Sequence, residues 1–207
     1  MPRFQLLLAT AVLGGSKPAA ATTFGFDCIT NEKAGDCAIG ESQLHLDVTS
    51  PGPEQIQFQL TNTGPAQSTI AGVYFGARLL GAISSISSAG VSFSADGSPP
   101  GLPGGQSISP AFSTDFRVNA KPAPPKNGVN PGDSLDVVFD LDAGVSAADV
   151  IAALDSGALR VGLHVINFAS GGSESFVCAV PEPSTLLLLA SGVAALRSMR
   201  RRARSSE

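Results

Sequence analysis

The sequence predicts a single, mainly β domain, folded as a β-sandwich of immunoglobulin-like or jelly-roll type with one short helix. Three observations lead to this expectation. The 207-residue chain is rich in Gly and Pro, low in charge and without Trp. Short stretches of alternating apolar and polar residues recur along it, separated at close intervals by turn-forming residues. Residues 22–179 lie between two terminal segments of different character, and a stretch of this length suits one domain with one core.

The first half of this region contains three predicted strands. Apolar residues alternate with polar ones over 44–49 and again over 55–60, where every second residue is a glutamine. The turn-forming residues 50–53 lie between them, so we expect a β-hairpin. A third apolar stretch, 70–80, contains two glycines, as expected of a strand that passes close to another backbone. The Ser-, Gly- and Pro-rich residues 83–105 are predicted to be mostly loop, with one short strand around Val91 and Phe93.

The second half contains the most regular alternation and the predicted helix. Ser146 and Asp149 resemble a capping box, and the following residues, 147–156, lead to Gly157, a residue type that commonly ends helices. A second proline-rich connection covers 121–132. Four strands are expected here, at 111–118, 135–142, 161–166 and 174–180.

The N-terminal segment has the features of a secretory signal peptide. Arg3 precedes an apolar run over 4–14 that is too short to span a bilayer, and Ala19, Ala20 and Ala21 offer an Ala-x-Ala cleavage site. We therefore predict a signal peptide over residues 1–21.

The C-terminal segment, 180–207, has the features of a membrane anchor. Pro181, Glu182 and Pro183 precede an apolar run over 184–196, and a basic tail follows. Thirteen residues make about 20 Å of helix against a hydrocarbon core of about 30 Å, a gap that snorkelling arginines and a thinned bilayer can close. The sequence predicts a transmembrane helix, with the body outside the inner membrane and five arginines on the cytoplasmic side: Arg197, Arg200, Arg201, Arg202 and Arg204.

This order of Pro-Glu-Pro step, short apolar run and arginine tail resembles the PEP-CTERM sorting signal of Gram-negative bacteria. The resemblance implies that exosortase, an integral-membrane cysteine protease, recognises Pro181, Glu182 and Pro183 and cleaves the chain there. The protein would then be held in the inner membrane with its body in the periplasm, and afterwards released to the cell surface or the extracellular matrix. Phrases such as 26–31, 72–75 and 171–176 also resemble ectodomains of the subgroup called cistern.

The charge of the chain is divided between an acidic body and a basic tail. Residues 22–179 contain fifteen Asp or Glu against six Lys or Arg, a net charge of −9. A nucleic-acid-binding domain would carry a basic patch in its folded part, and this body has no clustered Lys or Arg. We therefore expect no nucleic-acid partner.

The three cysteines predict one disulfide and one leftover thiol. An exported protein meets an oxidising compartment, so Cys28 and Cys37 are expected to form a disulfide around a short loop. Cys178 could pair within the fold, pair between chains or stay free. Neither a catalytic cysteine nor a zinc site is expected, because the chain has only two histidines and no Cys-His motif.

Other candidate chemistry is sparse. His45 and His164 fall on the outer faces of predicted strands, where a solvated role is expected over metal ligation. Asp136, Asp140 and Asp142 alternate along one strand about 7 Å apart, close enough to share a cation or to act on a sugar; a solvated edge that discourages aggregation is the favoured interpretation. No Gly-x-Ser-x-Gly motif is present, and we expect no bound metal and no cofactor.

These observations favour an exported, non-enzymatic protein of the envelope or matrix, sorted by exosortase, with exopolysaccharide as its candidate partner. The first alternative is a carbohydrate-binding module or adhesin that contacts glycans through loops 97–109 and 121–132, although the chain has a single Tyr. The second is an envelope glycoside hydrolase that uses the strand around Asp136.

Overall fold

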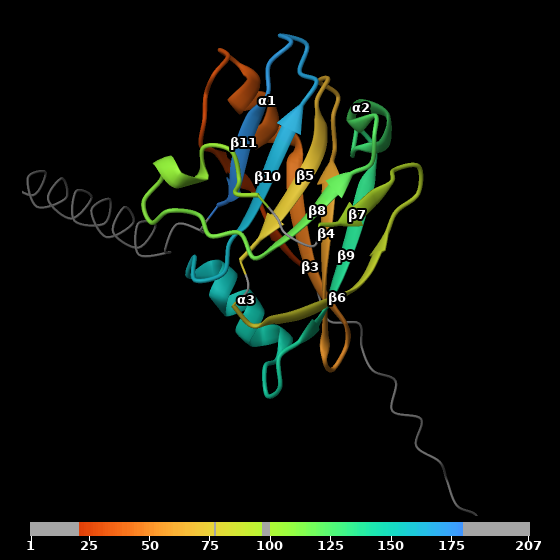
Figure 1. Ribbon diagram of the computed structural model, residues 1–207, viewed down its shortest axis with the longest axis vertical. Coiled ribbons are helices and arrows are strands. Elements are labelled where there is room, and N and C mark those ends of the chain that lie inside the picture. The colour runs from red at the N-terminus through yellow and green to blue at the C-terminus, as the bar shows by residue number, and fades with distance from the viewer. Residues whose placement is uncertain (1–20, 77, 97–99, 180–207) are drawn as a thin grey trace, which may run out of the picture.

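The computed structural model describes residues 21–76, 78–96 and 100–179. The C-terminal segment 180–207 and all but the last residue of the predicted signal peptide lie outside the described residues. The described chain is mainly β, as predicted, and its strands form two antiparallel sheets (Figure 1). The finer assignment, to an immunoglobulin-like or jelly-roll sandwich, stays a prediction.

One sheet has five strands in the order β1-β3-β4-β9-β6, and the other has six in the order β2-β11-β10-β5-β8-β7. The strands are β1 Thr22–Phe24, β2 Phe26–Cys28, β3 Leu44–Gly52, β4 Gln55–Asn62, β5 Thr69–Phe75, β6 Leu80–Ser87, β7 Phe93–Ala95, β8 Phe116–Ala120, β9 Ser134–Leu141, β10 Val161–Ile166 and β11 Glu174–Cys178. Helices α1 Asp36–Gln43, α2 Pro124–Asn127 and α3 Ala147–Asp155, and a 3-10 turn at Gly105–Ser107, lie in the connections.

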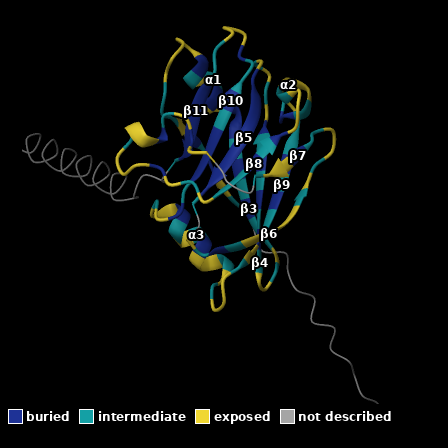
Figure 2. Ribbon diagram, in the orientation of Figure 1, coloured by how far each residue is buried: buried dark blue, intermediate teal, exposed yellow. Residues whose placement is uncertain are grey.

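Aromatic contacts show that the two sheets pack face to face. Phe58 on β4 and Phe139 on β9 belong to the five-stranded sheet, and Phe75 on β5 and Phe116 on β8 to the six-stranded one. The Phe139 ring lies 5.0 Å from that of Phe75 and 5.2 Å from that of Phe116, in edge-to-face geometry. Inner-facing side chains of both sheets form one buried cluster between them. Buried residues lie along the central strands of both sheets in Figure 2.

The predicted hairpin of β3 and β4 is confirmed. Leu46 faces Leu60 and Val48 faces Phe58 across an antiparallel pair, and the three apolar residues of each strand are fully buried. Because side chains alternate along a strand, the glutamines of β4 lie on the opposite, outer face.

Helix α3 is also confirmed, with its capping box. The Asp149 N–H donates to Ser146 Oγ over 3.3 Å, and the Ser146 N–H donates to Asp149 Oδ2 over 2.9 Å. Val150 and Leu154 face inward into the core, so α3 closes one end of the sandwich beside β3 and β4.

Helix α1 was not predicted from the sequence. Its glycine, Gly40, is unfavourable for an isolated helix, but a Cβ there would lie only 2.1 Å from the Phe176 ring. Gly40 therefore lets α1 pack directly on β11. The helix depends on this tertiary contact more than on local propensity.

Three strand predictions need correction. The stretch 70–80 divides, because β5 ends at Phe75 and β6 begins at Leu80, and β6 occupies part of the predicted loop. The stretch 111–118 forms a strand only from Phe116, since Phe112 packs with Leu102 on the outer face of the six-stranded sheet. The last predicted strand ends at Cys178. Among the described residues, no helix combines the length and apolar character needed to cross a bilayer.

Candidate functional site: the junction with the sorting segment

The folded body ends at a fixed backbone contact. Strand β11 lies between β2 and β10, and directly after it the Ala179 N–H donates to the Gly25 carbonyl over 2.9 Å. Gly25 is the residue at which the chain passes from β1 in one sheet to β2 in the other. The first and last described parts of the chain are thus joined at the same place, one residue before segment 180–207.

Cys178 precedes this contact and is a free, buried thiol. Its side chain packs in the core cluster, so of the three outcomes left open by the sequence, pairing within the fold does not occur. Burial, with smaller contributions from Asp27 and Asp155, raises the pKa of Cys178 to about 12. The thiol is therefore protonated at neutral pH and a poor nucleophile.

A hollow of about 410 Å³ opens beside the junction, and its lining includes Val177 and Cys178 of β11, segments 108–110 and 156–157, and Arg160. Arg160 fixes one wall, because its Nη1 donates to the Pro110 carbonyl over 2.9 Å and its Nη2 to the Ala111 carbonyl over 2.5 Å. The guanidinium also lies 5.2 Å from the centre of the Phe112 ring. These contacts hold the loop before β8 against the end of the sandwich.

Residues 179–202 match the PEP-CTERM protein-sorting motif. The chain carries a PEP-CTERM sorting signal. This signal implies an exported protein that exosortase processes at the membrane. The match includes Pro181, Glu182 and Pro183 and the arginines up to Arg202, all of which lie outside the described residues. No curated protein and no solved structure matches the chain.

The PEP-CTERM match begins at Ala179, the residue that is hydrogen-bonded to Gly25. The sorting signal therefore starts where the folded body ends, without an intervening linker. The strand predicted over 174–180 reaches the motif, but its link to Gly25 was not predicted, because residues so far apart in the chain show no local pattern.

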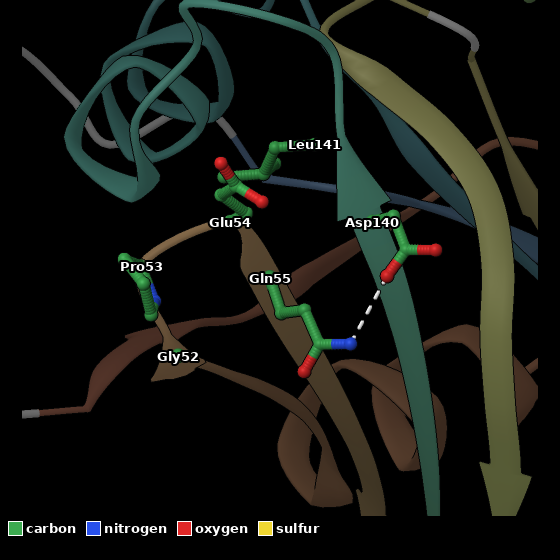
Figure 3. A pocket seen from close by; sticks show the side chains of 6 residues that line it. All are labelled: Gly52, Pro53, Glu54, Gln55, Asp140 and Leu141. Atoms are coloured by element: carbon green, nitrogen blue, oxygen red, sulfur yellow. Dashed lines mark hydrogen bonds between the residues drawn. The ribbon is translucent and has the colours of Figure 1, made fainter.

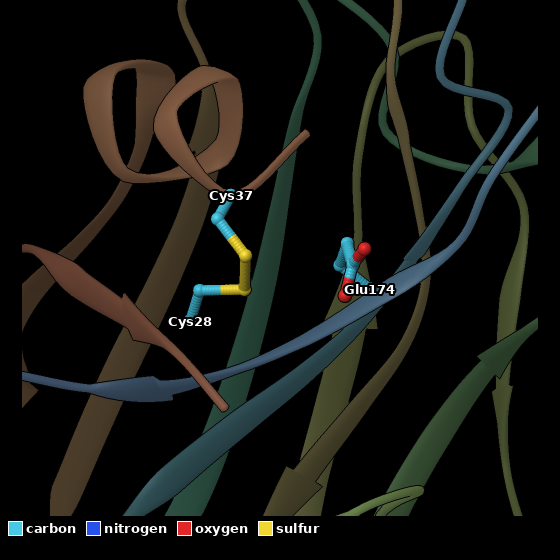
Figure 4. Close-up of side chains that lie close together, drawn as sticks. All are labelled: Cys28, Cys37 and Glu174. Carbon is cyan, nitrogen blue, oxygen red and sulfur yellow. A yellow bond between two sulfur atoms is a disulfide. The ribbon is translucent and has the colours of Figure 1, made fainter. Parts of the chain in front are cut away.

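The predicted disulfide between Cys28 and Cys37 is present and joins β2 to α1 (Figure 4). Glu174 on β11 lies near the two sulfur atoms, and by distance alone the three residues could hold a metal ion. The sulfurs, however, are bonded to each other. The Glu174 carboxylate accepts hydrogen bonds from the Lys33 N–H over 2.8 Å and from Thr30 Oγ1. This group fastens the loop between β2 and α1, a role that the sequence did not indicate.

The carboxylates on β9 are held by the glutamines of β4. Asp136 Oδ1 accepts from Gln57 Nε2 over 3.0 Å and from Gln59 Nε2 over 2.9 Å. Asp140 accepts from Gln55 over 3.0 Å, beside a hollow of about 290 Å³ at the β3–β4 turn (Figure 3). Asp142 lies after the end of β9, so it does not continue the row as expected. These bonds fit a polar sheet surface better than a catalytic pair.

The two histidines lie on different sheets. His45 on β3 is half-buried opposite Thr61 on the outer face of the five-stranded sheet. His164 on β10 is opposite Ser175, and burial, aided by the positive charge of Arg117, lowers its pKa. Among the described residues, neither histidine belongs to a group with metal-binding spacing.

Described residues of both loops considered for glycan contacts pack against the body. In the first loop, Leu102 and Ile108 lie in an apolar cluster with Phe112 on the six-stranded sheet. In the second, the backbone of Val129 pairs with that of Ile70. The only Tyr of the chain, Tyr74, is 2% exposed beneath Arg117, whose guanidinium lies 5.1 Å from the ring centre. Tyr74 is therefore not an exposed platform for stacking a sugar ring.

Proposed function

We propose that this PEP-CTERM protein is a non-enzymatic structural component of the extracellular matrix, associated with exopolysaccharide and released by cleavage at Pro181, Glu182 and Pro183. The observation that carries the proposal is the junction itself. A folded β body ends at Ala179, where the sorting signal begins, so cleavage detaches an intact domain from its anchor.

The state of the polar groups supports a structural role. Asp136, Asp140 and Glu174 accept hydrogen bonds from neighbouring side chains or backbone, and the free thiol of Cys178 is protonated and buried. An active site needs a nucleophile or an acid–base pair aimed at a cleft. The described residues instead use these groups to hold elements together.

The cleavage is tested by replacing Pro181-Glu182-Pro183 with Ala-Ala-Ala in the full chain, expressed in a host that has exosortase. Intact-mass measurement of surface material should show a shortened C-terminus for the wild type only, and the variant should stay in the membrane fraction. A control with Ser205 and Ser206 changed to Ala leaves the motif intact and should behave as the wild type. If wild type and variant both end at Glu207, the chain is not processed there.

The association with exopolysaccharide is tested separately. Released protein should co-sediment with exopolysaccharide isolated from the same cells, and it should move to the soluble fraction in cells that make no exopolysaccharide. Protein that stays soluble in both strains would refute the matrix role while leaving the sorting step untouched.

A further inference from the structure

One continuous stretch at the side of the sandwich contains no charged residue. Residues 80–95, which we call the neutral edge, contain β6, its connection and β7, and they include no Asp, Glu, Lys, Arg, His or Pro. The body around them carries a net charge of −9 over residues 22–179. Six serines give the neutral edge a polar surface of small side chains.

The neutral edge is also where both sheets end. β6 is the last strand of the five-stranded sheet and β7 the last strand of the six-stranded sheet, and both run along the right-hand side of the molecule in Figure 1. β6 pairs with β9 on one side, and no described residue pairs with its other side. Ile83 and Ile86 pack toward the core, whereas Ser84, Ser85 and Ser87 are exposed.

Natural proteins usually protect such an edge with charged side chains, prolines or bulges, because unpaired N–H and C=O groups invite another strand. β6 has no charged residue and no proline, and its bulges lie between Leu80 and Ser85. From Ser85 to Ser87 the pairing with β9 is regular. The second half of β6 therefore presents a regular, uncharged backbone edge.

We propose that the neutral edge binds a second copy of this chain, through antiparallel pairing of β6 with β6 about a two-fold axis. The distribution of charge favours a second copy of the chain as the partner. Two bodies of net charge −9 repel each other over most of their surfaces, whereas pairing of β6 with β6 places no charged residue of either strand against the other copy, the nearest carboxylates being on and after β9. A two-fold axis matches each backbone donor of β6 that points away from β9 with an acceptor on the other copy, and the small serines allow close approach.

Pairing in this way joins two five-stranded sheets into one sheet of ten strands. A single strand pair buries little surface, so we expect weak, reversible association that grows with local concentration. A role for this contact in the cell rests on the proposed matrix function, because release into a matrix would raise the local concentration of the protein. The contact itself does not depend on cleavage.

The test uses analytical ultracentrifugation over about a hundred-fold range of protein concentration, with wild type, Ser85→Lys and Ser156→Lys. The wild type should show an average mass that rises with concentration. Ser85→Lys puts two positive charges across the axis and should stay monomeric. Ser156→Lys, at the exposed end of α3, is the matched control and should behave as the wild type.

A second readout locates the contact. Amide hydrogen exchange in residues 83–88 should slow as the wild-type concentration rises, and it should not change with concentration in Ser85→Lys. Circular dichroism verifies that Ser85→Lys is folded. If Ser85→Lys does not fold, Ser87→Lys is used in its place. A wild type that is monomeric throughout, or an oligomer that Ser85→Lys leaves intact, overturns the proposal. Repeating the measurement on the Ala-Ala-Ala motif variant in detergent separates a failure of cleavage from a failure of association.

Discussion

The Ala179 N–H and the Gly25 carbonyl, 2.9 Å apart, tie the end of the folded body to the point where the chain crosses between the two sheets. Only Val180 separates Ala179 from Pro181, the first residue of the Pro-Glu-Pro step. A protease that acts here needs an accessible, extended stretch of backbone, and a folded domain is bonded in place two residues away.

We predict that insertion of about six Gly and Ser residues between Ala179 and Val180 speeds up processing. Extended residues add about 3.3 Å each, so the insertion moves the motif about 20 Å from the body. Pulse-chase labelling, with the fraction of shortened chain measured over time, gives the rate. The same insertion after Arg204 is the control. An unaltered rate for the first insertion would mean that the body does not limit access.

Replacement of both Cys28 and Cys37 by Ser should lower the free energy of unfolding by about 2–3 kcal/mol. The bridge closes a loop with a sequence separation of 9, and a loop of this size restricts the unfolded chain by about that amount. Urea unfolding of wild type and double variant measures the difference. Reductant should destabilise the wild type and leave the variant unaffected; equal midpoints for both proteins would contradict the prediction.

The buried thiol of Cys178 should make the protein less stable as pH rises from about 9 to about 12. Burial raises the thiol pKa from 9.0 to about 12, so over this range the unfolded chain loses a proton that the folded protein keeps. The contribution to stability is thus complete below pH 9 and is lost above it. Denaturant unfolding between pH 8 and 11 measures this slope, which should be shallower in Cys178→Ala.

Gly162→Ala should destabilise the protein by about 1–3 kcal/mol through overpacking. A Cβ at Gly162 would lie 2.7 Å from Leu102 Cδ2 and 3.2 Å from Phe112 Cζ, so the end of the Leu102 side chain would have to turn away and the Phe112 ring would have to move by a few tenths of an ångström. The matched control is Gly101→Ala in the same loop, where a Cβ meets nothing within 4 Å. Thermal unfolding distinguishes them, and equal stabilities would show that the loop gives way without cost.

The sequence predicted those parts of the fold that depend on neighbouring residues. The alternation around Phe58 predicted the hairpin of β3 and β4, and Ser146 with Asp149 predicted the start of α3. The close spacing of Cys28 and Cys37 predicted the disulfide. Each of these signals lies within a few residues of the element that it specifies.

The parts that were missed depend on distant contacts. Helix α1 contains Gly40, a weak helix former, and its place on the sheet comes from Phe176, which is far away in the chain. β6 is rich in serine and resembles a loop, yet Ile83 and Ile86 anchor it to the core. The candidate sorting site shows the same division. Its residues 179–202 have a local signature, whereas the Gly25–Ala179 bond has none.

The position of β11 also decides how the body bears mechanical load. A force applied to the body through segment 180–207 would act on Ala179, directly after the end of β11. That strand is bonded on one side to β2 and on the other to β10. A pull along its axis therefore loads two hydrogen-bond ladders in shear, many bonds at once, and does not unzip a free edge strand bond by bond.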